Sequence, residues 1–144
     1  MTLEELEGML PNGLHGAEVE RIEVDYRRRT VTLELAVWVG KMDDPPERRE
    51  AYKSGRLEIS GLLFLVMEPP DPKYRFTRAG LTVDGCDMSK NLKGDLLRSV
   101  PDDSFFRSLW VNEWNAFIHV AGKSADIVWA NDGAITYRKP KANS

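Results

Sequence analysis

Residues 31–39 alternate between apolar and other side chains without a break, and this stretch constrains the fold more than any other. The apolar positions fall on one face at every second residue: Val31, Leu33, Leu35, Val37 and Val39. This pattern predicts a half-buried antiparallel strand, because successive side chains in a strand point to opposite faces of the sheet. Trp38 falls on the other face, so its side chain is expected to point away from the core or into a second layer.

The preceding segment is predicted to pair with this strand as a hairpin. Ile22, Val24 and Tyr26 alternate with charged residues, while Val19 lies out of phase and indicates a bulge. The polar connection between the two strands is then 27–29. Further strands are expected over residues 56–68, 109–121, 126–130 and 134–137, and one or two short strands within 74–84.

Helical structure is expected only in short pieces. Thr2 is a candidate N-cap for a helix within residues 2–10, and a helical turn is expected over 95–100. Residues 40–55 form a long polar connection, the best candidate for a mobile loop, and residues 139–144 a frayed tail. We therefore predict one mainly β domain over residues 1–144, an antiparallel sandwich or partly open barrel of about six to eight strands.

Charge and cysteine content limit the classes of protein to which the chain can belong. There are 20 Lys and Arg residues against 23 Asp and Glu residues, a net charge of −3. This balance argues against a nucleic-acid-binding protein, which usually carries a basic surplus. A single cysteine, Cys86, forms no intramolecular disulfide and fits a reducing compartment. No signal peptide and no membrane-spanning run is evident, so we expect a cytoplasmic protein without membrane association.

Two motifs resemble a group of small bacterial domains of uncharacterised function. Residues 10–17 read Leu-Pro-Asn-Gly-Leu-His-Gly-Ala, and residues 114–121 read Trp-Asn-Ala-Phe-Ile-His-Val-Ala. The group opens with Leu-Pro-Asn-Gly-aromatic-His-Asp-Ala and carries a late Trp-Asn-x-Phe-Ile-His-Ile-Ala strand, so this chain departs at Leu14 and Gly16. The resemblance covers most of the chain and implies no known activity. Some bacterial domains of similar layout look like immunity proteins of toxin systems.

The two histidines of the chain, His15 and His119, lie inside these motifs and are the candidates for chemistry. If the fold brought them together with Glu18 and Glu113, the cluster would suit a divalent metal or general acid–base catalysis. Asn115 is expected on the same strand face as His119 and Glu113. The alternative is that each histidine makes a structural hydrogen bond. No cofactor is predicted, and a divalent metal belongs only to the first alternative.

Other residues indicate an interaction surface. Arg27, Arg28 and Arg29 form the one compact basic cluster, which would suit an acidic partner surface or remain a solvated turn. Trp38 is either a packing residue or part of an interface, since an exposed large aromatic side chain is frequently a binding hot spot.

Three hypotheses for function follow. The first, favoured because no catalytic motif occurs, is a non-enzymatic protein-interaction or binding domain whose partner is another protein or a second copy of the chain. The second is a small metal-binding or hydrolytic enzyme with a pocket around His15 and His119. The third is an immunity-type protein that neutralises a toxin, a special case of the first.

Overall fold

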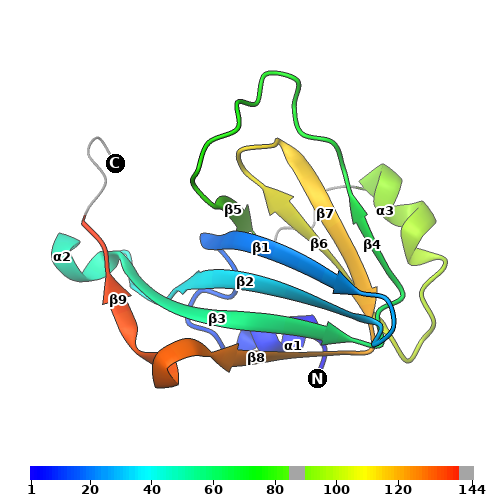
Figure 1. Cartoon of the computed structure of the whole chain (residues 1–144), viewed down its shortest axis with the longest axis horizontal. Coiled ribbons are helices and arrows are strands. Elements are labelled where there is room, and N and C mark those ends of the chain that lie inside the picture. Colours follow the sequence, from blue (N-terminus) through cyan, green and yellow to red (C-terminus); the bar gives the residue numbers. More distant parts are fainter. Residues whose placement is uncertain (85–89, 140–144) are drawn as a thin grey trace.

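The computed structural model describes residues 1–84 and 90–139, with the side chains of 90–93 outside that description. The described helices are α1 (Leu3–Gly8), α2 (Pro46–Arg49), α3 (Lys90–Leu97) and the short 3-10 helix η1 (Ala130–Gly133). The described strands are β1 (Ala17–Asp25), β2 (Thr30–Trp38), β3 (Ala51–Ser60), β4 (Phe64–Met67), β5 (Leu81–Asp84), β6 (Phe105–Val111), β7 (Ala116–Gly122), β8 (Ser124–Trp129) and β9 (Ile135–Tyr137). The predicted mainly β, antiparallel fold is confirmed (Figure 1).

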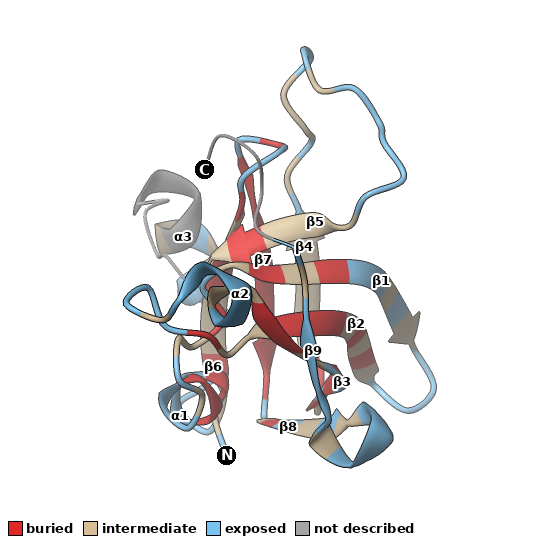
Figure 2. Ribbon diagram, turned by 90° about the vertical axis from the view of Figure 1, so that its left-hand side faces the viewer, coloured by how far each residue is buried: buried red, intermediate tan, exposed pale blue. Residues whose placement is uncertain are grey.

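All nine described strands belong to one antiparallel sheet in the order β4-β7-β6-β5-β1-β2-β3-β8, with β9 also paired to β3. The end strands β4 and β8 continue the chain of β3 and β7, each after a short bend. The same two chain segments therefore pair on both sides of the bend, and the sheet folds back over its own core (Figures 1 and 2). The sheet stays open, because β4 and β8 do not pair with each other.

Two glycines make this bend possible. Gly61 has φ of +61°, a conformation that L side chains rarely adopt. A Cβ on Gly122 would lie 2.6 Å from Cγ2 of Ile59, so only a residue without a side chain allows this approach. The guanidinium of Arg29 fastens the same corner from the β1–β2 turn: its Nη2 donates to the Leu62 carbonyl oxygen at 2.9 Å.

The strongest sequence predictions are confirmed. Val31, Leu33, Leu35 and Val37 of β2 are buried in the core, and β1 and β2 pair as a hairpin. The register of that hairpin shifts between Val19 and Arg21, which is the predicted bulge.

Helix α1 lies against β8 and β6 and contributes to the core. The Thr2 hydroxyl accepts a hydrogen bond from the Glu5 backbone N–H, as expected of an N-cap. Leu3 and Leu6 are buried. Arg107 of β6 and the helix residue Glu7 form an ion pair at 2.9 Å. Apolar packing and this ion pair together hold the helix against the sheet.

The expected single strand over 109–121 is wrong: the segment is the hairpin of β6 and β7. Residues 112–115 form its turn, and Asn115 adopts a φ of +51°, which asparagine tolerates better than most residues. The strand-like alternation of the sequence continues through this turn because Trp114, a turn residue, packs into the core and is only 8% exposed.

Other element boundaries also differ from expectation. The third strand starts at Ala51, inside the expected loop 40–55, because Ala51–Lys53 pair with β9 and with β2. The expected strand 56–68 is interrupted by the bend at 61–63 and continues as β4. Within 74–84 one short strand forms, β5, as expected. Helix α3 begins at Lys90, five residues before the expected turn, and Cys86 and 140–144 lie outside the described residues.

The bend gives a direct test of the fold. We expect Gly122→Ala to lower the free energy of unfolding by about 1–3 kcal/mol, because the new methyl group meets Ile59 in a packed corner. Gly94→Ala is the matched control: a Cβ there meets nothing within 4 Å, and we expect a gain of about 0.5–1 kcal/mol in helix α3. Urea unfolding of both variants measures the difference, and equal stabilities would contradict the packing described for Gly122.

Candidate functional site

His119 on β7 is fully buried and belongs to a hydrogen-bonded network inside the fold. Its Nδ1 lies 2.7 Å from the Ser108 hydroxyl and its Nε2 lies 3.1 Å from Oε2 of Glu68. The imidazole stacks against Phe106 and Phe117, with ring centroids 6.0 and 5.7 Å away. Both ring nitrogens are therefore within hydrogen-bonding distance of a partner.

This trio resembles a nucleophile–histidine–carboxylate arrangement in composition only. Ser108 and His119 are both 0% exposed, so no substrate reaches the hydroxyl. The other carboxylate oxygen of Glu68 accepts the Phe117 backbone N–H at 2.7 Å. The arrangement fits the structural alternative for His119, with side chains as its partners.

His15 lies in a different environment. Its side chain is 64% exposed, its Nδ1 is 2.9 Å from Oδ2 of Asp84, and its ring meets Trp38 edge-on at 6.2 Å. Asn115 lies in the β6–β7 turn and not on the strand face of His119. Among the described residues, no three His, Cys, Asp or Glu side chains converge to hold a metal ion. The structure thus does not bring the two histidines into one pocket.

Two of the predicted residues, Glu18 and Trp38, do come together, in a hollow of about 190 Å³ on the outer face of β1, β2 and β3. We call it the acidic–aromatic pocket. Its lining is Gly16, Glu18, Trp38, Met42, Glu50, Tyr52 and Thr82. Glu113, also a candidate, supports this region from the β6–β7 turn, because its carboxylate accepts the backbone N–H of Thr82 at 2.7 Å.

The polar groups of the pocket are strongly coupled. The Tyr52 hydroxyl donates to Oε2 of Glu50 at 3.1 Å, and burial together with that carboxylate raises the pKa of Tyr52 to about 12. The guanidinium of Arg138 lies 4.0 Å from the centre of the Tyr52 ring and its Nη1 is 2.6 Å from Oε1 of Glu18. That hydrogen bond to Glu18 raises the pKa of Arg138.

Trp38 points into a second layer on the outer face, one of the two placements expected from its phase. Its indole N–H donates to the Arg49 carbonyl oxygen at 2.7 Å, which anchors the loop that carries α2. The Asn12 amide donates to the carbonyl oxygens of Trp38 and Gly40, at 3.2 and 2.8 Å. Trp38 is therefore a packing residue that also forms one wall of the pocket.

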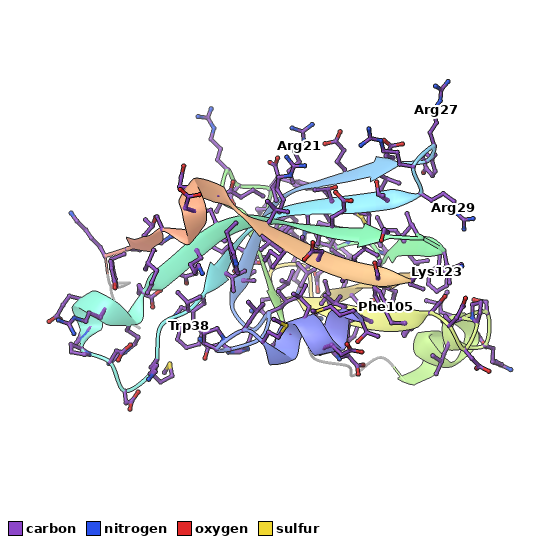
Figure 3. The ribbon with its side chains drawn as sticks, turned by 90° about the horizontal axis from the view of Figure 1, so that it is seen from below. Arg21, Arg27, Arg29, Trp38, Phe105 and Lys123 are labelled. Carbon is purple, nitrogen blue, oxygen red and sulfur yellow. The ribbon has the colours of Figure 1, made fainter. Side chains whose placement is uncertain are left out.

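The three arginines of the β1–β2 turn do not act as one cluster. Arg27 and Arg28 are exposed, and their backbone N–H groups both donate to the Asp25 carboxylate. Arg29, with φ of +54°, turns its guanidinium to the Leu62 carbonyl oxygen. Figure 3 shows Arg21 and Arg27 pointing away from the sheet, while Trp38 lies at the other end near α2.

A second surface feature was not predicted as such: a partly apolar groove between the open edges of β1 and β4. Two hollows, of about 410 and 320 Å³, follow one another along these strands. We call them together the β1–β4 groove. Its apolar lining residues are Val19, Ile22, Val24, Tyr26, Leu62, Leu63, Phe64, Leu65, Met67, Tyr74, Phe76, Ala79, Leu81 and Trp114.

The edges of the groove lack strand partners within the described residues. β1 pairs with β5 only over Ala17–Val19, so Arg21–Asp25 has β2 on one side and no strand on the other. β4 pairs with β7 alone. The segment 68–80, which projects from the sheet in Figure 1, borders the same groove. Its Lys-Tyr-Arg-Phe-Thr-Arg run over 73–78 was the sequence signal available for this site.

Comparison with known proteins adds no assignment, because no family model, curated protein or solved structure matches the chain. None of the helices in the described ranges 1–84 and 90–139 has the length and apolar character needed to cross a bilayer.

The buried network predicts a difference between the two histidines. We expect His119→Leu to lower the free energy of unfolding by about 2–4 kcal/mol, because the buried Ser108 hydroxyl and the partly buried Glu68 carboxylate would lose their partner. His15→Leu should change it by less than about 1 kcal/mol, since an exposed ion pair contributes little. Urea unfolding decides, and a larger loss for His15→Leu would contradict these placements.

The pKa of Tyr52 predicts a dependence of stability on alkaline pH. Since the pKa is about 12 in the folded protein against 10 in the unfolded chain, the folded form holds the proton more tightly. The resulting stabilisation is complete below pH 10 and is lost as the pH rises towards 12. Between these values the wild type should lose on the order of 1–2 kcal/mol more than Tyr52→Phe in urea unfolding. If the wild type and Tyr52→Phe lose the same free energy of unfolding over this pH range, the pKa of Tyr52 is not raised in the folded protein.

Proposed function

We propose that this chain is a protein-binding domain that receives an extended segment of a partner protein in the β1–β4 groove. The observation that carries the proposal is the open sheet: two strand edges that lack strand partners among the described residues flank a partly apolar groove. Unpaired backbone groups at such an edge accept an added strand, and apolar side chains beside them supply contact area.

Exposed apolar side chains in the groove support the proposal. Tyr26 is 86% exposed, Phe76 83% and Met67 47%. Tyr74 packs edge-on against Phe76, with ring centroids 4.8 Å apart, so the aromatic surface is partly fixed in place before binding. Large aromatic side chains fixed in this way are typical binding hot spots.

The charges beside the groove favour an acidic partner segment, although the whole chain is acidic. Residues 72–78 contain Lys73, Arg75 and Arg78 and no acidic residue. All three are exposed. Arg27 and Arg28 are exposed beyond the other end of the groove. We therefore propose a segment with apolar residues at alternate positions and acidic residues at its ends.

Site-specific photocrosslinking tests the proposal. A benzophenone amino acid replaces Phe76 in one variant and Tyr26 in another, and crosslinking is carried out in lysate of the source cells. We expect both positions to capture the same segment of one protein, because they border the same groove. A peptide of that segment should bind the wild type, and Phe76→Ala should weaken it by about 5–30-fold.

The matched control places the same crosslinker at Tyr137, which is 56% exposed on β9, away from the groove lining. Equal capture from Tyr137, or a peptide that binds Phe76→Ala as well as it binds the wild type, would overturn the proposal. Capture of the chain itself would identify the partner as a second copy, and capture of a toxin would make the domain an immunity protein.

A further inference from the structure

The acidic–aromatic pocket offers a binding site that is separate from the proposed peptide groove. None of its lining residues lines the β1–β4 groove. We propose that this pocket binds an organic monocation, a guanidinium or alkylammonium group, between the rings of Trp38 and Tyr52 and the carboxylates of Glu18 and Glu50. The inference is independent of the proposed function.

The carboxylates of the pocket exceed the cations that balance them. Glu18 is paired with Arg138 at 2.6 Å. Glu50 accepts a hydrogen bond from the Tyr52 hydroxyl, and among the side chains of residues 1–84 and 94–139 none forms an ion pair with its carboxylate. Among the described side chains, the Glu50 carboxylate therefore lines the hollow without a paired cation.

The chain itself shows how this site holds a cation. The guanidinium of Arg138 lies over the Tyr52 ring at 4.0 Å and binds the Glu18 carboxylate, and its backbone N–H donates to the Glu50 carbonyl oxygen. A ring face together with a carboxylate is the usual environment of a bound organic cation, because the negative face of the ring attracts the charge. A ligand cation would use the same two kinds of group on the Glu50 side of the pocket.

The size and walls of the hollow favour an organic cation over a metal ion. Its volume of about 190 Å³ exceeds that of a bare ion, and Trp38, Tyr52 and Met42 provide apolar wall. Magnesium and calcium prefer six or more oxygen ligands. No group of three metal-ligating side chains occurs here or elsewhere in the described residues. Met42, 71% exposed, lies where it can cover the apolar part of a ligand.

Titration of the whole chain with simple cations tests the inference. The probes are methylguanidinium and tetramethylammonium, with sodium at the same ionic strength as the reference. Two-dimensional NMR follows the Trp38 indole N–H and the amides of Gly16 and Thr82. We expect saturable shifts of these signals with a dissociation constant of about 1–10 mM. Absence of saturable shifts with both organic cations would overturn the proposal.

Variants separate the pocket from nonspecific charge attraction. Glu50→Gln should weaken binding about fivefold, because it removes the carboxylate that lacks a cation while keeping the shape. Glu58→Gln is the matched control: it lies on β3, the strand that begins directly after Glu50, is exposed and is outside the pocket. It should leave the affinity within about twofold of wild type. Arg138→Ala should strengthen binding about threefold, because the Glu18 carboxylate then lacks its ion-pair partner as well. Equal effects of Glu50→Gln and Glu58→Gln would contradict the site.

The source of the cation is decided with blocked amino acids. N-acetyl-arginine N-methylamide and its trimethyllysine counterpart carry the same cations on a peptide backbone. If they bind as tightly as the free cations, the ligand is a protein side chain. If only the free cations bind, the ligand is a small amine or guanidine. These outcomes concern the pocket alone. If no cation binds, the proposal of a peptide-binding groove still stands, and if crosslinking at Phe76 fails, the proposal of a cation site still stands.

Discussion

The close packing at the bend, where the sheet folds back on itself into two layers, is the constraint from which the rest of the structure follows. Ile59 fills the space beside Gly122, and a β carbon there would lie 2.6 Å from the isoleucine methyl group. The bend lets β3 and β7 continue as β4 and β8, so one pair of chain segments forms a ladder in both layers. The layers enclose the core, but the edges of β1 and β4 diverge from the bend and leave the groove between them (Figure 1).

The buried histidine contributes to this surface indirectly. Glu68 follows β4 directly and begins the segment that projects beside the groove. Its carboxylate is held by the Phe117 backbone N–H and by His119, and its own N–H donates to the Phe117 carbonyl oxygen. These contacts fix the base of the segment that carries Tyr74 and Phe76. His119 therefore helps to fix the position of the segment that borders the groove.

The sequence predicts the regular parts of this fold because their patterns are local. The alternation of 31–39 locates β2, its buried face and the outward position of Trp38. The same reasoning failed at 109–121, since Trp114 packs inward from a turn and imitates a strand residue. It also failed for the start of β3, where pairing with the distant β9 extends the strand into an apparently polar loop.

The candidate sites show the same limit. Trp38 was recognisable as an unusual position in a pattern, whereas Glu18 was a candidate only through its place beside His15. Tyr52 lay inside an expected loop, and Arg138 sat near an expected frayed tail, so neither was a candidate from sequence. Only the pairing of Ala51–Lys53 with β9 brings the guanidinium of Arg138 onto the Tyr52 ring. Contacts between segments this far apart in the chain carry no local signature.

Amide hydrogen exchange of the chain with and without the crosslinked partner segment tests the central claim most directly. The account predicts that backbone amides of Arg21–Asp25 and Phe64–Met67 exchange faster than those at the centre of β2 in the free protein. It predicts that exchange in one or both of these edges slows when the segment is added, because an added strand bonds to their unpaired groups. Protection confined to β8 and β9, or no change at either groove edge, would contradict it.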